Sequence, residues 1–252
     1  MPQRLLTTLK VLLRRKRLSR ALVLHSRKYT LRLTAPTLMN ILCRQKRDRF
    51  SKPENLAILL VNNRSDQTAL ETSLLYLGVR DYVVVKPLVP NGAWKQSIKV
   101  GEALNFARKC AEEYILYADS DDAVILGDPG KAVDLLVQSG GQALFSVTSF
   151  PENRGRHDLN GWFRQLADRS GWSHSDAIYL NSGVFVARRE FLVSFLETAS
   201  EYVADDSLLF NKGASLREVS EKFDNDQVIY QILYPRFSDD LRLDYAEELA
   251  LR

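Results

Sequence analysis

The chain has 252 residues, of which 45% are hydrophobic and 26% are charged, and its formal net charge is +4 at pH 7. This size and composition predict one large globular domain rather than two small ones. Two cysteines, Cys43 and Cys110, are too few for a disulfide framework or a zinc site and fit a reducing compartment. No apolar run reaches the roughly 20 residues that span a bilayer, and arginines interrupt the early apolar stretches that a secretory signal would need. We therefore expect a cytoplasmic protein.

The net charge hides a strong asymmetry between the two parts of the chain. Residues 1–52 carry 15 lysines and arginines and one acid, whereas residues 53–252 carry 20 basic and 30 acidic residues. Leucines spaced among these basic residues predict one or two amphipathic helices. Such a basic extension could lie on an anionic membrane surface, as a peripheral anchor, or pack on the acidic body with its charges solvated. Nucleic acid is the least favoured partner, because Tyr29 and Phe50 are the only aromatic residues available for stacking on bases.

After residue 52, apolar runs of strand length alternate with segments of helical spacing. This alternation predicts a three-layer α/β domain with a mostly parallel central sheet. The predicted strands are 56–62, 82–85, 114–118, 143–147 and 177–187, and the predicted helices are 66–77, 96–113, 129–137, 190–202 and 226–233. The segment between 148 and 176, with Arg154, His157, Trp162 and Trp172, is predicted to be rich in loops.

An acidic cluster directly follows the predicted strand 114–118. Asp119, Asp121 and Asp122 place three carboxylates within four residues, which repel one another unless a cation lies among them. Hard divalent ions such as Mg²⁺ or Mn²⁺ prefer oxygen ligands and are often shared with substrate phosphates. Ligands of open α/β sheets bind at the carboxyl ends of the strands. The cluster therefore predicts a metal site for a phosphate-bearing substrate, and the alternative is a solvated acidic turn.

Other acidic motifs fit this cluster poorly. An EF-hand requires Gly and Glu where this chain has Val124 and Gly130. A phosphatase of the haloacid dehalogenase type carries its Asp-x-Asp pair on the first strand. A nucleotidyltransferase usually opens with a Gly-rich phosphate loop, whereas the first strand here leads into Val61-Asn62-Asn63-Arg64. Nucleotidyl transfer nevertheless stays open as the alternative enzymatic function.

Three further segments surround the acidic cluster in a fixed order. Residues 94–99 open the helix before it, Leu180-Asn181-Ser182-Gly183 follows it, and Asp224-Asn225-Asp226-Gln227 begins a late helix. Together with the acidic cluster they resemble a glycosyltransferase of the GT-A fold. The set is most similar to the glycosyltransferase domain of the procollagen lysyl hydroxylase (galactosyl/glucosyltransferase-like) group, over roughly residues 56–246. Each motif is short, and only their combination is informative.

The resemblance implies a donor side of the site. Asp119 and Asp122 match the metal-binding aspartates, and Asp121 stands where the family often has an aromatic residue packed on the base, so it could add a third carboxylate. Lys99 matches a lysine placed toward the diphosphate. The residues that match nucleotide contacts are Val61, Asn62, Asn63 and Trp94. Taken alone, Lys99 would be a solvated helix residue and Trp94 a packing residue.

The resemblance also implies a sugar and acceptor side. Asn181, Ser182 and Gly183 match the sugar-side loop, although alone they would be an ordinary turn. Asp226 is the first candidate for the catalytic carboxylate and Asp224 the second, and either residue could instead cap a helix. Gln227 and Asn181 are expected to hydrogen-bond sugar hydroxyls.

The expected function is transfer of a sugar from a nucleotide diphosphate, with a UDP-sugar as the expected donor, to a hydroxyl of a glycan, protein or lipid. The expected cofactor is Mn²⁺ or Mg²⁺. The family also uses a late histidine as a metal ligand, but His157 and His174 lie in a polar stretch and are expected to be exposed. The alternative outside enzymology is a non-catalytic adaptor for membrane or nucleic acid that acts through residues 1–52.

Overall fold

The computed structural model describes residues 50–89, 94–120, 123–125, 127–152, 157–204 and 223–249. Residues 1–49 therefore lie outside the described part of the chain. The helices and the membrane-surface role predicted for residues 1–52 stay predictions. Within the described part of the chain, no helix is both long enough and apolar enough to cross a membrane.

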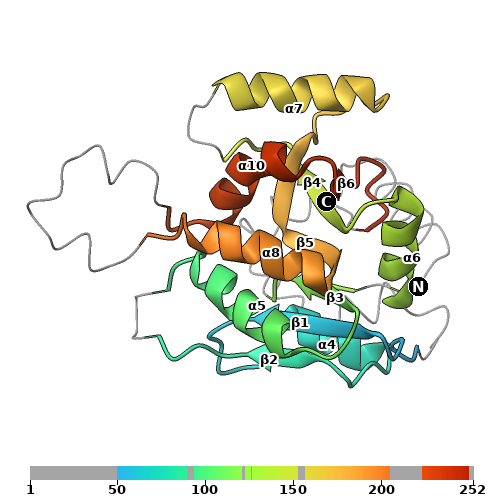
Figure 1. Ribbon diagram of the computed structural model, residues 1–252. Coiled ribbons are helices and arrows are strands. Elements are labelled where there is room, and N and C mark those ends of the chain that lie inside the picture. Colours follow the sequence, from blue (N-terminus) through green and yellow to red (C-terminus); the bar gives the residue numbers. More distant parts are fainter. Residues whose placement is uncertain are drawn as a thin grey trace, which may run out of the picture.

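A six-stranded mixed sheet forms the centre of the molecule (Figure 1). Its spatial order is β2-β1-β3-β5-β4-β6, and only β5 runs against its neighbours. β1, β3 and β4 are buried along their whole length, as expected for strands covered on both faces. The strands are β1 (Leu56–Val61), β2 (Val83–Val85), β3 (Tyr114–Ala118), β4 (Ala143–Thr148), β5 (Tyr179–Arg188) and β6 (Leu241–Leu243).

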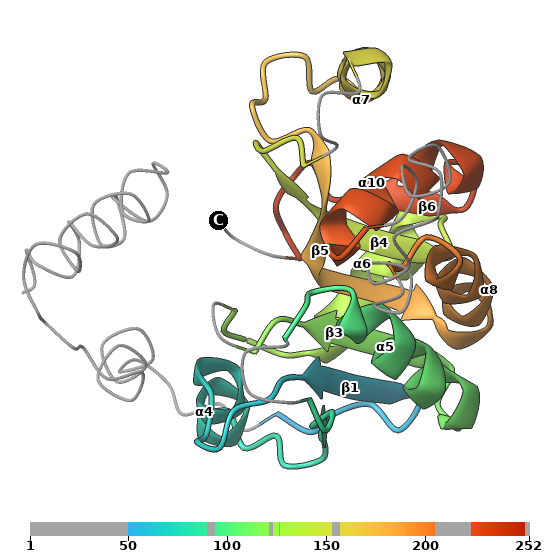
Figure 2. The same ribbon diagram turned by 90° about the vertical axis from the view of Figure 1, so that its left-hand side faces the viewer.

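Helices cover both faces of this sheet. Leu56, Ile58 and Leu60 of β1 pack in the same cluster as α4 and α6, whereas its alternate residues pack with α5, α7, α8 and α10. Figure 2 shows α4 on one side of the sheet and α5 and α8 on the other. The helices are α4 (Ala69–Tyr76), α5 (Ile98–Lys109), α6 (Gly130–Ser139), α7 (His157–Arg169), α8 (Arg189–Ser200) and α10 (Asp226–Phe237). The predicted three-layer α/β class with a mostly parallel sheet is confirmed.

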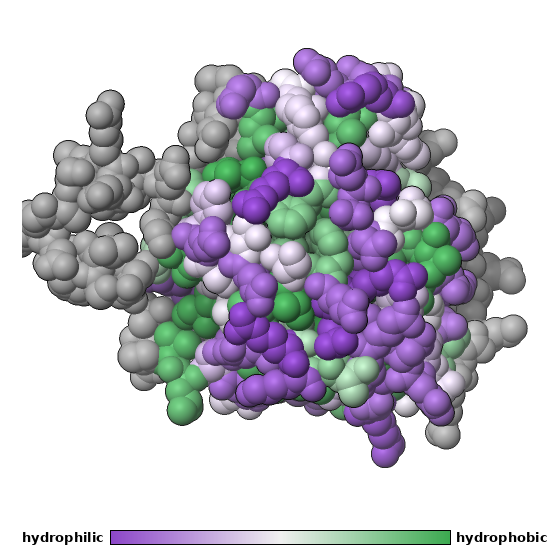
Figure 3. Space-filling model, in the orientation of Figure 1, coloured by the Kyte–Doolittle hydropathy of each residue, from purple (hydrophilic) through white to green (hydrophobic). Residues whose placement is uncertain are grey.

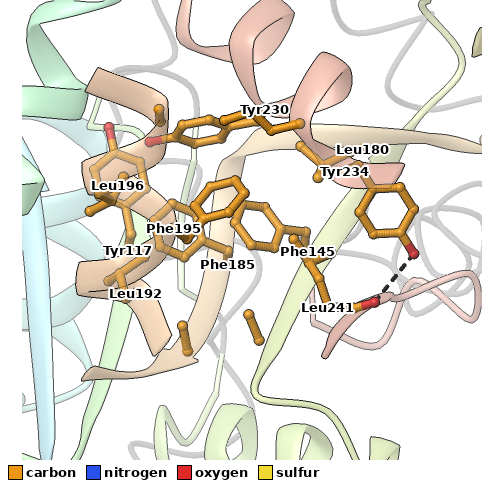
Figure 4. Close-up of a cluster of buried hydrophobic side chains, with 14 of the residues drawn as sticks. Tyr117, Phe145, Leu180, Phe185, Leu192, Phe195, Leu196, Tyr230, Tyr234 and Leu241 are labelled. Atoms are coloured by element: carbon orange, nitrogen blue, oxygen red, sulfur yellow. Dashed lines mark hydrogen bonds between the residues drawn. The ribbon is translucent and has the colours of Figure 1, made fainter. Parts of the chain in front are cut away.

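Stacked aromatic rings join the middle strands to α10 (Figure 4). The ring of Phe185 in β5 lies 4.5 Å from that of Phe145 in β4 and 4.9 Å from that of Tyr117 in β3. Tyr230 of α10 meets Phe145 edge to face, with the ring centroids 5.9 Å apart. Since such rings bury much apolar area in fixed geometry, the start of α10 is held firmly against the sheet.

The predicted loop-rich segment 148–176 was wrong in its middle part, which forms α7. Leu159, Phe163 and Ala167 are buried on one side of this helix, at the i, i+4, i+8 spacing of an amphipathic helix. The many polar residues and Gly161 hid that spacing in the sequence. Trp162 and Trp172 pack against the core, while Arg154 and the side chain of His157 lie outside the described part of the chain.

The structure differs from the prediction in two further elements near the end of the domain. β6 was not predicted, because three residues that alternate apolar and basic give a weak strand signal. α10 continues past the predicted end at residue 233 and includes Pro235. The proline lies in the last turn, where burial of Leu233 and Tyr234 offsets the lost backbone hydrogen bond.

Candidate active site

The carboxyl ends of β1 and β3 lie side by side and are joined by polar side chains. Asn62 Nδ2 donates a hydrogen bond to Ser120 Oγ over 3.0 Å, and both residues are buried. Asn62 Oδ1 accepts a hydrogen bond from the backbone N–H of Arg64 over 3.0 Å. Val61 is buried within β1, so Asn63 is the exposed member of the predicted nucleotide-contacting trio.

A buried lysine connects two aspartates from distant parts of the chain. Lys99 of α5 donates a hydrogen bond from Nζ to Asp119 Oδ1 over 2.7 Å, and the same nitrogen lies 3.9 Å from Asp226 Oδ2. The side chain of Lys99 is only 11% exposed and that of Asp226 only 5%. Burial of these charges is costly unless they are paired. The alternative that Lys99 is a solvated helix residue is therefore wrong. Three of the predicted site residues, Lys99, Asp119 and Asp226, lie together.

A bulge in β5 shapes this cluster. Phe145 faces Phe185 and Val147 faces Leu180, so two steps along β4 correspond to five along β5. The three extra residues fall at the predicted sugar-side segment. A strand bulge of this kind commonly re-aims side chains beside active sites. Residues 181–183 are therefore part of strand β5, and the alternative that they form an ordinary turn is wrong.

Hydrogen bonds fix the bulge in place. Asn181 Nδ2 donates to Ser146 Oγ over 2.8 Å, and Asn181 Oδ1 accepts from the N–H of Gly183 over 3.1 Å. The carbonyl oxygen of Gly183 accepts from the N–H of Asp119 over 2.7 Å. The amide of Asn181 thus supports the bulge, and Asp119 is tied to β5 as well as to β3.

Gly183 allows a close approach of the Asp119 carboxylate. A Cβ at position 183 would lie 3.0 Å from Asp119 Oδ2 and 3.3 Å from Asn181 Oδ1. Such distances are tighter than ordinary van der Waals contact, so a side chain here would displace the carboxylate. The glycine therefore provides the space beside Oδ2.

Asp226 lies in the first turn of α10 in an environment that disfavours its charge. Burial raises the pKa of its carboxyl to about 6, the nearby carboxylate of Asp119 adds to the rise, and Lys99 and a hydrogen bond with Ser182 oppose it. A pKa in this range suits a group that gives up or accepts a proton near neutral pH. A carboxyl whose pKa is strongly perturbed by burial and by a specific charge partner is a candidate for a functional residue.

The N-cap of α10 is Asn225, whereas Asp224 and Asp226 were the expected capping residues. Asn225 Oδ1 accepts hydrogen bonds from the backbone N–H of Gln227 over 2.9 Å and of Val228 over 3.3 Å. The capping role predicted for Asp224 or Asp226 is therefore wrong. Asp224 is exposed, and its carbonyl oxygen accepts from the N–H of Ser97 over 3.0 Å, which links the starts of α10 and α5.

Tyr117 is a member of the cluster that was not predicted. Its hydroxyl donates to Asp119 Oδ1 over 3.0 Å. Burial, together with the charges of Asp119 and Asp226, raises the pKa of Tyr117 well above its usual value, so the hydroxyl stays protonated and remains a donor. Residues two apart in a strand point to the same face, and this period could have identified Tyr117 from Asp119.

The remaining predicted site residues lie at the edge of this cluster or outside the described residues. Gln227 and Trp94 are half-buried, and Trp94 packs against the hydrophobic core, which agrees with a packing role. Asp121 and Asp122 lie outside the described part of the chain. Among the described residues, no three His, Cys, Asp or Glu side chains gather in a metal-binding group. The metal set is therefore still a prediction, of which Asp119 is the described member.

The described residues nevertheless fit a hard cation. Two carboxylates share one ammonium group, which leaves one negative charge in excess, and Asp121 and Asp122 follow Asp119 closely in the sequence. Oδ2 of Asp119 faces the space that a Cβ at position 183 would fill. Carboxylate oxygens are the ligands that Mg²⁺ and Mn²⁺ prefer.

Comparison with protein families found no matching family model, and no curated protein matched the chain either. Solved structures resemble it at low identity. A glycosyltransferase involved in glycosylation of the major capsid of PBCV-1 is 13% identical, with 75% of this chain and 80% of that chain covered and a TM-score of 0.44. Mouse xyloside xylosyltransferase 1, in its apo form, is 11% identical over 80% of this chain and 79% of that chain, with a TM-score of 0.38.

A third structure is glucosyl-3-phosphoglycerate synthase from Mycobacterium tuberculosis in complex with Mn²⁺, UDP and glucosyl-3-phosphoglycerate. It is 15% identical, with 81% of this chain and 72% of that chain covered and a TM-score of 0.34. Two of these three proteins are glycosyltransferases by name. Similarity at this level concerns the course of the chain and assigns no activity to it.

Proposed function

We propose that this chain is a metal-dependent glycosyltransferase that moves a sugar from a nucleoside diphosphate, with a UDP-sugar as the first donor to test, to a hydroxyl acceptor. One observation carries the proposal: Asp119 and Asp226 converge on the buried Lys99 at the carboxyl edge of the sheet. This edge is the usual ligand site of open α/β sheets. Carboxylates and a lysine suit a reaction in which a diphosphate departs and an acceptor loses a proton.

Asp226 is the proposed catalytic carboxylate. In the reaction the bond between the anomeric carbon and the diphosphate oxygen breaks, and a bond forms between that carbon and the acceptor oxygen. The acceptor proton passes to a base. Asp226, with its pKa raised to about 6 by burial, is ionised at neutral pH and can take that proton. Its charge can also stabilise the oxocarbenium character that develops at the anomeric carbon.

The other site residues are proposed to bind and orient the diphosphate, the metal ion, the nucleotide and the sugar. Lys99 holds both carboxylates and offers positive charge to the leaving diphosphate. Asp119, Asp121 and Asp122 would hold Mn²⁺ or Mg²⁺, which when bound supplies further positive charge against that leaving group. The proposed contacts of the nucleotide are Asn63 and Trp94, and those of the sugar are Ser182 and Gln227. The exposed Asp224 is the second candidate for the base.

Thermal unfolding with UDP, GDP, ADP and CDP, each with and without Mn²⁺, tests the proposal. A ligand that binds only the folded state at about 100 times its dissociation constant stabilises it by about 2.7 kcal/mol. We expect one diphosphate to raise the unfolding temperature when Mn²⁺ is present, and Asp119→Asn to abolish the shift. Asp134→Asn, which removes an exposed carboxylate in α6, serves as the control and should keep it.

Two outcomes would contradict the proposal. Absence of any shift in folded protein would favour a non-catalytic scaffold that acts through residues 1–52. Release of pyrophosphate from a nucleoside triphosphate, in place of a nucleoside diphosphate from a sugar donor, would favour nucleotidyl transfer.

A further inference from the structure

Phe150 is exposed to solvent at the edge of the sheet that carries the candidate active site. β4 and β3 both run antiparallel to β5, so β4 ends at the same edge as Asp119. Only β5 separates these two strands, so they run roughly 10 Å apart, or two strand spacings, and β4 extends two residues farther than β3 beyond their shared level at Phe185. Two residues beyond β4, Phe150 is 65% exposed.

The backbone around Phe150 is held from inside the protein. Its N–H donates to Thr148 Oγ1 over 3.2 Å, and its carbonyl oxygen accepts from Gln231 Nε2 over 3.4 Å. The same Nε2 donates to the carbonyl oxygen of Leu180 over 2.9 Å, while Gln231 Oε1 accepts from the N–H of Glu152 over 3.0 Å. The exposed ring is thus attached to a fixed backbone.

Gln231 links this loop to the catalytic helix. It is fully buried, and it follows Asp226 by five residues on α10. A buried amide is tolerated only when its hydrogen bonds are satisfied, and here it bonds to β5 and to the loop after β4. The loop that carries Phe150 and the helix that carries Asp226 are therefore positioned relative to each other by one side chain.

We propose that Phe150 forms one wall of the acceptor subsite and stacks on the ring of a pyranoside, so that the acceptor is a glycoside. This inference rests on the proposed transferase function and specifies its acceptor. One face of a pyranose ring presents C–H bonds, which pack on the negative face of an aromatic ring, while its hydroxyls point to the polar rim. Gln231 acts as a positioning residue.

The solitary position of the ring favours a sugar over a lipid chain. A lipid would require a continuous apolar surface. Among the described residues, the other strongly exposed large apolar side chains lie on α4, β2, the segment after β2 and α6: Leu75, Val83, Leu88 and Val137. On the face drawn in Figure 3, apolar surface occurs in small areas between hydrophilic residues.

Saturation-transfer NMR with the methyl glycosides of glucose, galactose, mannose and xylose tests the inference on the full chain. We expect at least one glycoside to receive saturation on the C–H protons of one ring face. Phe150→Ala should weaken its binding by about tenfold, as expected for loss of one aromatic contact. Phe150→Trp should restore binding, and Val137→Ala, an exposed apolar truncation in α6, should leave it unchanged.

A parallel measurement separates this inference from the proposed function. Nucleoside diphosphate with Mn²⁺ should stabilise wild type and Phe150→Ala equally, because the ring belongs to the acceptor side. Glycoside binding that Phe150→Ala leaves intact, or no binding of any glycoside to wild type, would overturn the inference while the nucleotide shift persists. Loss of the nucleotide shift in wild type would instead refute the transferase function itself.

Discussion

Replacement of Asp226 by asparagine should make the folded protein more stable at neutral pH. Burial raises the pKa of this carboxyl from 3.8 to about 6, so the folded state holds its proton more tightly than the unfolded state does. The free energy of unfolding therefore falls as pH rises from about 4 to above 6. A difference of about two pKa units corresponds to about 3 kcal/mol. Asparagine resembles the protonated acid and avoids this cost.

Urea denaturation of wild type and Asp226→Asn at pH 4, 6 and 8 measures the effect. We expect the variant's advantage over wild type to grow by about 3 kcal/mol between pH 4 and pH 8, a thermal shift of roughly 6–12 °C for a domain of this size. Comparison across pH cancels any difference in packing between the amide and the acid. Asp134→Asn, the exposed control, should show no such growth.

A constant or shrinking advantage between pH 4 and pH 8 would refute the reasoning. It would mean that Lys99 and Ser182 stabilise the Asp226 carboxylate more than burial destabilises it. The sugar transfer proposed above should be lost in the same variant, because an amide cannot take the proton of the acceptor. Active sites commonly hold such groups at a cost in stability.

Three other substitutions probe the same edge of the sheet. Lys99→Met should destabilise the fold by about 3–5 kcal/mol at pH 8, and by less at pH 4, because Asp119 and Asp226 lose their shared cation; urea denaturation measures this. Gly183→Ala should abolish the nucleotide-dependent thermal shift and cost about 1–3 kcal/mol of stability, because the new Cβ crowds Asp119 Oδ2. Tyr245→Phe should be neutral or should stabilise by about 1 kcal/mol in thermal unfolding, since the buried hydroxyl has no hydrogen-bond partner among the described residues. A large loss of stability in Tyr245→Phe would show that this hydroxyl is satisfied after all.

The layers of the fold could be predicted because β1, β3 and β4 are covered on both faces. Such strands appear in the sequence as continuous apolar runs with helical segments between them. The short β6 and the polar α7 gave weaker patterns, since their assignment depends on contacts with neighbouring elements. Sequence periodicity alone carries no information on those contacts.

The convergence of Asp119, Lys99 and Asp226 could be anticipated only from the order of the motifs. The ionic pairing itself requires α5 and α10 to pack on the same face of the sheet, which no local pattern specifies. The helix cap shows a similar limit. Asp224, Asn225 and Asp226 are all good capping residues, and the extended backbone at Asn225 decides which of them caps the helix.

The bulge in β5 also bears on how this molecule could change over time. Its three extra residues are absorbed between two regular stretches of pairing with β4, and β5 pairs regularly with β3 from Val184 to Arg188, beyond them. A substitution at Asn181 or Gly183 would therefore act at once on Ser146 of β4 or on the Asp119 carboxylate, because these residues are in contact. Evolutionary change in this part of the strand is thus tied to change in the residues that it positions.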